Sequence, residues 1–255
     1  MKKVAVIGAG PSGITAIKNF IDEGFDVTAF ERCDGVGGNW RFNDPSGHSS
    51  VFETTHIISS KYTSFYEDYP LPDDASDYPS HKELLSYFNG YAEHFNIKKN
   101  IKFGTEVLSC KQLPNGRWLL KYKHLDGNEE ITLEFDALVV CNGHHHVPRY
   151  PQYKGEFTGE FLHSHDYKRA APFENKRVLV IGGGNSACDV AVETSRISQE
   201  TSLSWRRGYH LVPKFMYGLP ADVFAKRSRW IPQFLRIPFM KFMLESYQGK
   251  NEDIG

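Results

Sequence analysis

Three glycines near the N-terminus have the spacing that lets a backbone approach a phosphate group. Gly8, Gly10 and Gly13 form a G-x-G-x-x-G turn after the apolar run Lys3–Ile7. In such a turn the first glycine permits a tight bend, the second admits a phosphate close to the backbone, and the third lets the following helix pack on the strand. Glu31 follows roughly 20 residues later, where a carboxylate accepts both hydroxyls of a ribose and repels a 2′-phosphate. The pattern predicts a dinucleotide site.

A second glycine-rich loop, Gly35–Trp40, comes soon after this carboxylate and carries an aromatic side chain. Alone it fits a surface loop, but its place just after Glu31 and Arg32 leads us to expect that it wraps the same ligand. The residues predicted to contact this first ligand are Gly8, Gly10, Pro11, Ser12, Gly13, Glu31, Arg32, Gly38 and Trp40.

A further turn, Gly182–Ala187, has the pattern G-x-G-x-x-A and follows the apolar run Arg177–Ile181. Here the position equivalent to Glu31 falls on Trp205 and the arginine pair that follows it. Arginine forks match phosphate geometry, which predicts a preference for NADPH over NADH, although a solvated arginine pair at a strand end is the alternative. An acidic end in one unit and a basic end in the other suggest one FAD and one NADPH. The second set of predicted contacts is Gly182, Gly184, Asn185, Ser186, Arg206 and Arg207.

The elements that must position these turns follow from the hydrophobic pattern. Each glycine turn lies between a short apolar strand and a helix, and a second strand follows, so two β-α-β units are predicted. The strands are expected at 3–7, 25–30, 177–181 and 203–205, and the helices at 11–23 and 185–197. Between the units we expect an irregular stretch at 34–80, a helix at 81–95, a β-meander at 105–110, 117–124 and 130–136, and a strand at 136–141.

The predicted fold class is therefore α/β, with two Rossmann-like dinucleotide-binding units. The first is expected to be a three-layer ββα FAD domain with a β-meander, and the second a partial NADPH domain. The predicted divisions are 1–147 for the FAD-binding part, 148–175 for a linker, and 176–255 for the NADPH-binding part.

Composition narrows the class of protein. The chain has 255 residues, 40% hydrophobic and 24% charged, with a net charge of −1, which fits a folded protein and disfavours a nucleic-acid partner. Its four cysteines (Cys33, Cys110, Cys141 and Cys188) lie far apart, which argues against a thiol-redox pair or a zinc cluster and favours a cytoplasmic location. No apolar run reaches the ~18 residues of a membrane helix, so no membrane partner is expected. Three consecutive histidines, His144–His146, cannot all face one point on an extended chain, so no metal is expected.

The segment between the two units carries a fingerprint. Phe157–Tyr167 reads F-x-G-x-x-x-H-x-x-x-Y, with Phe157, Gly159, His163 and Tyr167 at the defining positions. It resembles the fingerprint of the flavin-containing monooxygenases, class B flavoproteins, and the final Tyr resembles their N/S-oxygenating branch. Cys141–Pro148 also resembles the crossover between the flavin and NADPH domains of that family.

The resemblance implies an oxidoreductase that binds FAD and NADPH and inserts one oxygen atom from O2 into a small amine or sulfide through a C4a-hydroperoxyflavin. It implies that Trp40 lies near the flavin, that the fingerprint shapes the junction and the NADPH site, and that a homodimer is an open option. No catalytic residue is assigned. The alternatives are an NADPH oxidase or reductase that releases hydrogen peroxide, and a non-catalytic nucleotide-binding fragment.

Two features depart from the family pattern. Family members commonly carry an Asn near the flavin where this chain has Ile58, within Ile57–Lys61, which puts efficient oxygen transfer in question. Members also carry a further flavin-domain segment after the NADPH domain, so the chain resembles an N-terminal portion. The aromatic stretch Trp230–Tyr247 is expected to be broken at Pro232 and Pro238, to cover the cofactor cleft, and to expose apolar surface in this chain.

Overall fold

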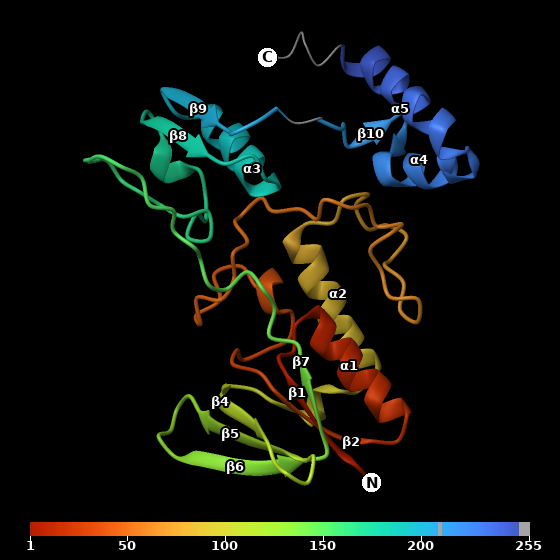
Figure 1. The fold of residues 1–255 in the computed structure, drawn as a ribbon, viewed down its shortest axis with the longest axis vertical. Helices are drawn as coiled ribbons and strands as arrows, with labels where there is room; N and C mark the ends of the chain where they lie inside the picture. Colours follow the sequence, from red (N-terminus) through yellow and green to blue (C-terminus); the bar gives the residue numbers. More distant parts are fainter. Residues whose placement is uncertain (209–210, 250–255) are drawn as a thin grey trace. The chain divides into compact units, whose positions relative to one another are not determined.

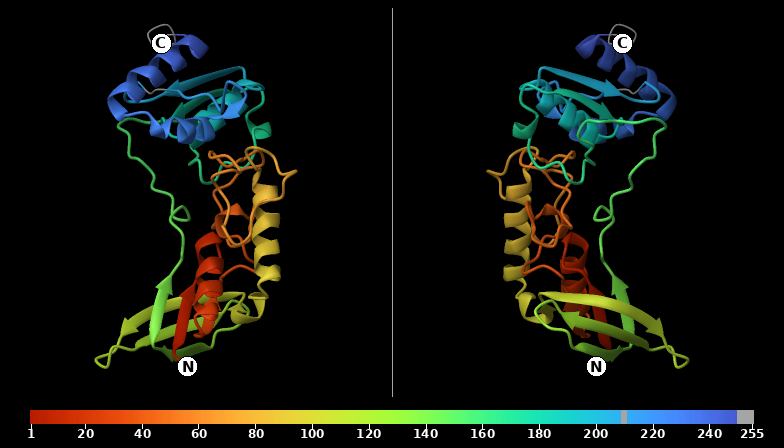
Figure 2. Two further views of the ribbon diagram at one scale, coloured as in Figure 1. Left: turned by 90° about the vertical axis from the view of Figure 1, so that its right-hand side faces the viewer. Right: turned by 90° about the vertical axis from the view of Figure 1, so that its left-hand side faces the viewer.

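The computed structural model describes residues 1–208 and 211–249 and divides into two compact units (Figures 1 and 2). The first unit comprises Met1–Thr55 and Ser80–Arg169, and the second comprises His56–Pro79 and Ala170–Gly255. The irregular stretch predicted at 34–80 is thus shared between the units, and its only helical turn among the described residues is η1 (Gly38–Trp40). The domain boundaries predicted after residues 147 and 175 separate nucleotide-binding domains rather than compact units, so they stay predictions.

The first unit is built on a parallel sheet with the strand order β3-β2-β1-β7. The central strand, β1, is apolar throughout its middle, and Val4, Ala5 and Val6 are fully buried, as expected for a parallel sheet covered on both faces. The four strands are β1 (Lys3–Ile7), β2 (Asp26–Phe30), β3 (Ile101–Lys102) and β7 (Ala137–Val140).

Two helices form the layer on one side of this sheet (Figure 1). Helix α1 (Pro11–Asp22) begins with a proline, whose missing N–H costs nothing in the first turn, and buries Ile14 and Ile17. Helix α2 (His81–His94) begins with a capping box, in which the side chains of Ser80 and Glu83 satisfy each other's backbone N–H groups.

The third layer is an antiparallel meander on the opposite side (Figure 1). Its strands are β4 (Thr105–Gln112), β5 (Trp118–His124) and β6 (Glu130–Phe135). The meander packs on the parallel sheet through aromatic rings, because Phe30 of β2 contacts Tyr122 and Phe135 with ring centroids 4.9 and 6.0 Å apart. The predicted three-layer architecture is therefore confirmed.

The second unit contains the second β-α-β motif: β8 (Arg177–Ile181), α3 (Asn185–Ser195) and β9 (Glu200–Ser204). The two strands are parallel, as predicted, but β9 starts before the predicted residue 203. Leu179 and Ile181 on β8 remain 61% and 51% exposed. The other elements of this unit are η3 (Ala171–Phe173), β10 (Phe215–Met216), β11 (Leu219–Pro220), α4 (Ala221–Arg227), η4 (Ser228–Trp230) and α5 (Gln233–Gln248).

One prediction about this unit is wrong. Pro232 does precede α5, but Pro238 lies inside it and does not end it. A proline within a helix removes one N–H donor, and here the flanking residues keep their helical conformation despite that loss. Apolar side chains are exposed, as predicted, with Trp230, Phe234 and Phe242 at 83%, 75% and 67%. Within 1–208 and 211–249, no helix has the length and apolar character needed to cross a membrane.

Candidate functional site

The first glycine turn leaves no room for side chains at two positions. A Cβ on Gly8, whose φ is +96°, would lie 2.4 Å from the carbonyl oxygen of Cys141, and a Cβ on Gly13 would lie 2.0 Å from the carbonyl oxygen of Gly8. Both distances are far below van der Waals contact, so glycine at these positions lets β1, β7 and α1 approach one another. The turn is packed as the hexapeptide predicted.

Gly10 differs from its neighbours because nothing crowds it from its own turn. A Cβ on Gly10 would have the Cα of Gly38 as its nearest neighbour, at 3.6 Å. Gly10 is also the N-cap residue of α1, where no side chain caps the helix. The second glycine loop therefore lies against the first, and the N–H of Gly37 donates to the carbonyl of Ala9 at 3.1 Å. The N–H groups at the start of α1 have no intrahelical partners and are available to an anion.

Glu31 closes the other side of this turn. It is only 7% exposed, and its carboxylate accepts from the N–H of Ala9 at 2.6 Å and from the N–H of Cys33 at 2.8 Å. The side chain is thus held beside the glycine turn by the backbone. A carboxylate oxygen can accept a second hydrogen bond, so each oxygen retains capacity for a donor from a ligand.

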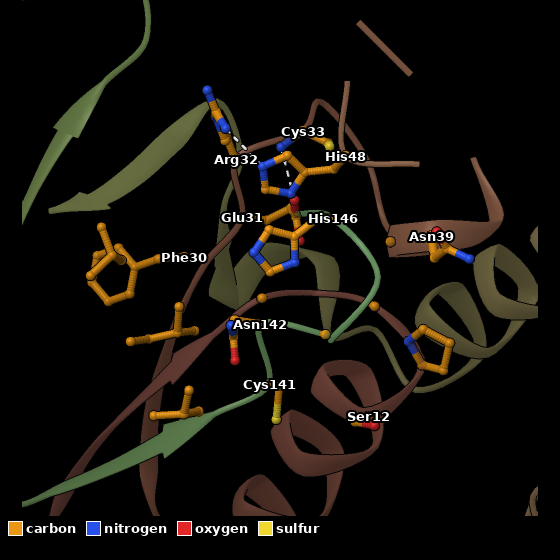
Figure 3. Close-up of a pocket in the computed structure, with 18 of the residues that line it drawn as sticks. Ser12, Phe30, Glu31, Arg32, Cys33, Asn39, His48, Cys141, Asn142 and His146 are labelled. Carbon is orange, nitrogen blue, oxygen red and sulfur yellow. Dashed lines mark hydrogen bonds between the residues drawn. The ribbon is translucent and has the colours of Figure 1, made fainter. Parts of the chain in front are cut away.

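These residues border one cavity of about 800 Å³, within the range of cofactor sites (Figure 3). Of the residues predicted to contact the first ligand, all but Gly13 line it, namely Gly8, Gly10, Pro11, Ser12, Glu31, Arg32, Gly38 and Trp40. Gly13 instead serves the packing of α1. The crossover after β7 forms another part of the wall, through Cys141–His146.

The cavity also holds an arginine–histidine arrangement that the sequence did not indicate. Nη1 of Arg32 lies 2.7 Å from Nε2 of His48, and the ring of His48 stacks on that of His146 at 4.9 Å and 13° (Figure 3). Because the guanidinium can only donate, Nε2 of His48 must accept, which requires a neutral ring. Burial, with the nearby positive Arg32 and then His146, lowers the pKa of His48. His48 lies in the irregular stretch, where no periodicity or motif singles it out.

The loop next to this cavity is held by a buried carboxylate. Asp44 accepts from Sγ of Cys33 at 3.2 Å and from Nε of Arg41 at 2.8 Å. Burial raises the pKa of the Cys33 thiol to about 12, so the thiol stays protonated and acts as a donor. This cysteine is structural. In the part of the chain that the structure describes, no group of three or more His, Cys, Asp or Glu side chains is arranged to hold a metal.

The second glycine turn has the same local construction in the second unit. The parallel register pairs Ile181 with Ser204, and the N–H of Gly182 donates to the carbonyl of Ser204 at 2.9 Å. Gly184 is the N-cap of α3, and no atom lies within 4 Å of a Cβ built on it. Asn185 and Ser186 open the helix, and Arg206 and Arg207 follow the end of β9, all four exposed. The carboxyl ends of the two strands thus bring the predicted contacts to one edge.

The fingerprint residues have different environments. Tyr167 is 2% exposed and packs edge-on against Phe52 at 5.4 Å, whereas Phe157 is 73% exposed with its ring against Gly159. Nδ1 of His163 accepts from the N–H of His165 at 3.0 Å. Only Tyr167 is part of the core of the first unit, so a role for the other three in a nucleotide site stays a prediction.

Comparisons with known proteins agree with this geometry. The family described as Flavin-binding monooxygenase-like matches residues 1–251. The dimethylaniline monooxygenase [N-oxide-forming] 2 of Mus musculus is 38% identical over 262 residues, covering 98% of this chain and 49% of the relative. The chain thus spans about half the length of the curated relatives it matches.

Solved structures show the same fold. The S-allyl-L-cysteine S-oxygenase of Allium sativum has a TM-score of 0.76 and 28% identity, over 85% of this chain and 54% of that one. The cyclohexanone monooxygenase of Rhodococcus sp. Phi1, solved with NADP+, has a TM-score of 0.65 and 25% identity, over 83% of this chain and 39% of that one. With two glycine turns placed as the sequence predicted and a family match along nearly its whole length, the chain belongs to the flavin-binding monooxygenase-like family.

Proposed function

We propose that this chain forms the nucleotide-binding part of an FAD- and NADPH-dependent monooxygenase that transfers one oxygen atom of O2 to a soft nitrogen or sulfur nucleophile. The observation that carries the proposal is the cavity of the first unit, where an uncrowded glycine at a helix N-terminus faces a buried carboxylate. The relatives named for N-oxide formation and for S-oxygenation support the class of substrate.

The residues around the cavity fit FAD. A Cβ on Gly10 would enter the space in front of the N-terminus of α1, where a diphosphate needs direct access to N–H groups. Arg32 lines the same cavity, and its Nε is buried without a hydrogen-bond partner among the described residues. That unsatisfied donor would be satisfied by a ligand oxygen.

Each group then has a task. The N–H groups that open α1, with Gly10 and Ser12, would hold the diphosphate, and Glu31 would accept from the ribose hydroxyls. Trp40 and the second glycine loop would cover the ligand and exclude water. When bound, the flavin supplies the hydride acceptor and the chemistry with O2, so no protein nucleophile is needed.

In the second unit the exposed N–H groups at the start of α3 would hold the diphosphate of NADPH. Arg206 and Arg207 would pair with its 2′-phosphate, which NADH lacks. Because both arginines are exposed, water and salt screen them, and we expect their contribution to NADPH binding to weaken as the salt concentration rises.

A second candidate function rests on Ile58. Its side chain is 68% exposed and has no hydrogen-bonding group, at the position where the family commonly has an Asn. An enzyme without that amide would consume NADPH and O2 and release hydrogen peroxide instead of an oxygenated product.

One experiment separates these functions. The protein, in its full natural length and loaded with FAD, is supplied with NADPH, O2 and a panel that includes dimethylaniline and S-allyl-L-cysteine, and both oxygenated product and peroxide are counted per NADPH. Product approaching one per NADPH supports the monooxygenase, and peroxide alone supports the oxidase. Ile58→Asn should shift the ratio toward product, whereas the apolar control Ile58→Leu should not. The third alternative, a non-catalytic fragment, is tested separately: it would be supported if the purified 255-residue chain took up no flavin.

A further inference from the structure

A single carboxylate in the second unit gathers three donors from a distant part of the sequence. Oδ2 of Asp222, at the start of α4, accepts from the N–H of Ser60 at 2.8 Å, from the hydroxyl of Ser60 at 2.9 Å and from the hydroxyl of Thr63 at 2.5 Å. Its other oxygen accepts from the N–H of Val223 at 2.9 Å. Both oxygens are therefore committed to acceptance, and all the bonds are to an ionised group, which makes them stronger than neutral ones.

The burial of Ser60 makes its hydrogen bonds to Asp222 costly to break. Ser60 is fully buried, so its N–H and hydroxyl would lose their partners without access to water if the carboxylate were removed. Leaving such groups unsatisfied costs more than the bonds contribute when formed.

Ser60 and Thr63 belong to the segment His56–Pro79, and the other end of this segment also binds residues close to Asp222 in the sequence. The hydroxyl of Tyr78 donates to the carbonyl of Lys214 and accepts from the N–H of Ala221 at 3.4 Å. Its ring packs edge-on against Phe215 at 5.4 Å, with Nζ of Lys214 5.5 Å from the ring centroid. The segment His56–Pro79 leaves the first unit and returns to it, yet its contacts place it in the second unit.

This attachment determines which unit carries position 58. Ile58 precedes the clamped Ser60 by two residues and is exposed, while the backbone on its C-terminal side is held by Asp222. We propose that Asp222 is a positioning residue, whose carboxylate fixes the 57–63 turn to α4, so that Ile58 is carried by the second unit. Its consequence for catalysis rests on the proposed function: the fraction of NADPH that yields product depends on where this turn is held.

The structural half of the proposal is tested on the 255-residue chain without cofactors, by hydrogen–deuterium exchange. Asp222→Asn keeps the size of the side chain, but an amide presents N–H₂ at one of the two oxygens, and both oxygens face donors in the native protein. We expect amide exchange in the 57–63 turn to become at least tenfold faster, with β8 and β9 of the second unit and the β4–β5 hairpin of the first unit unchanged as internal references. The matched control is Asp74→Asn, which removes an exposed carboxylate from the same segment and should leave exchange as in the wild type.

Unchanged exchange at 57–63 in Asp222→Asn would overturn the proposal. If the second unit of that variant fails to fold, shown by loss of protection in β8 and β9, Thr63→Ala and Thr63→Ser decide instead. The alanine variant loses a donor to Asp222 and should exchange faster, while the serine variant keeps the hydroxyl and should not; equal exchange in the two would count against the clamp.

The catalytic half uses the FAD-loaded protein in its full natural length. Asp222→Asn should raise peroxide released per NADPH at least threefold relative to Asp74→Asn, with FAD affinity and the KM for NADPH within twofold of the wild type. A merely structural role would lower stability and leave the peroxide ratio unchanged, which would refute the positioning role even if exchange behaves as expected. Failure of the proposed function is distinct, because a protein without flavin or NADPH oxidation would still show the exchange result.

Discussion

The two glycines Gly10 and Gly13 should respond to alanine in opposite ways. At Gly13 the new Cβ would start 2.0 Å from the carbonyl oxygen of Gly8, so backbone must move by more than an ångström. At Gly10 the nearest atom would be 3.6 Å away and φ is −70°, which alanine adopts readily. One substitution therefore damages the fold, and the other obstructs only the ligand.

The magnitudes follow from these contacts. Overpacking at Gly13→Ala should cost about 1–3 kcal/mol of unfolding free energy, lowering Tm by roughly 3–10 °C. At Gly10→Ala an N-cap cost of about 0.5–1 kcal/mol is offset by about 0.4–1 kcal/mol of reduced freedom in the unfolded chain, so Tm should hardly change. Loss of one charge-assisted bond to the diphosphate, worth about 1.5–3 kcal/mol, should weaken FAD binding about 10- to 150-fold.

The assay combines thermal unfolding of the cofactor-free chain, followed by circular dichroism, with titration of FAD followed by quenching of flavin fluorescence. Gly24→Ala is not a suitable control because φ there is +80°, whereas Ser12→Ala keeps the backbone and tests the hydroxyl alone. FAD binding by Gly10→Ala as tight as that of the wild type, or unfolding of Gly13→Ala at the wild-type temperature, would refute these roles for the two glycines.

Three further predictions concern charge and reactivity. Because the pKa of His48 is lowered in the folded protein, the unfolded chain takes up the proton first as pH falls. The free energy of unfolding, measured in urea, should therefore decrease from about pH 6.5 downward. His48→Gln keeps an acceptor for Arg32 and should remove part of this pH dependence, and an unchanged pH dependence would contradict a lowered pKa for His48. Replacing Arg206 and Arg207 by alanine should reduce the preference for NADPH over NADH about 10- to 100-fold in the ratio of kcat/KM, since one or two charge-assisted contacts are lost; a ratio that does not move would place the 2′-phosphate elsewhere. With a pKa of about 12, Cys33 should be alkylated at pH 8 about a thousandfold more slowly in the folded chain than in urea, as measured by peptide mass mapping, and equal rates would show that it is not buried as described.

The sequence was sufficient to predict the structural features that depend on local backbone conformation. Both glycine turns, their flanking strands and helices, and the position of Glu31 follow from residue type and spacing, because a tight turn between a strand and a helix excludes side chains from particular positions. The capped start of α2 and the meander are local in the same sense. Eight of the nine residues predicted to contact the first ligand line one cavity for this reason.

What the sequence did not reveal depends on long-range contacts. His48 meets Arg32 and His146 only after the irregular stretch has folded, and Asp222 meets Ser60 across a separation of 162 residues. No periodic pattern encodes such pairs. The prediction for Pro238 was wrong for a different, local reason: a proline inside a helix removes one hydrogen bond, and the rest of α5 tolerates that loss.

The most direct test of the proposed FAD site is the flavin content of the purified chain, because every proposed task of Glu31, Arg32 and the first glycine turn requires FAD in that cavity. Titration of the folded chain with FAD, followed by its absorbance after removal of free ligand, should saturate at one FAD per chain, and Gly10→Ala should not saturate over the same concentrations. A wild-type chain that remains colourless while its circular dichroism shows a folded protein would contradict the assignment of the cavity to FAD.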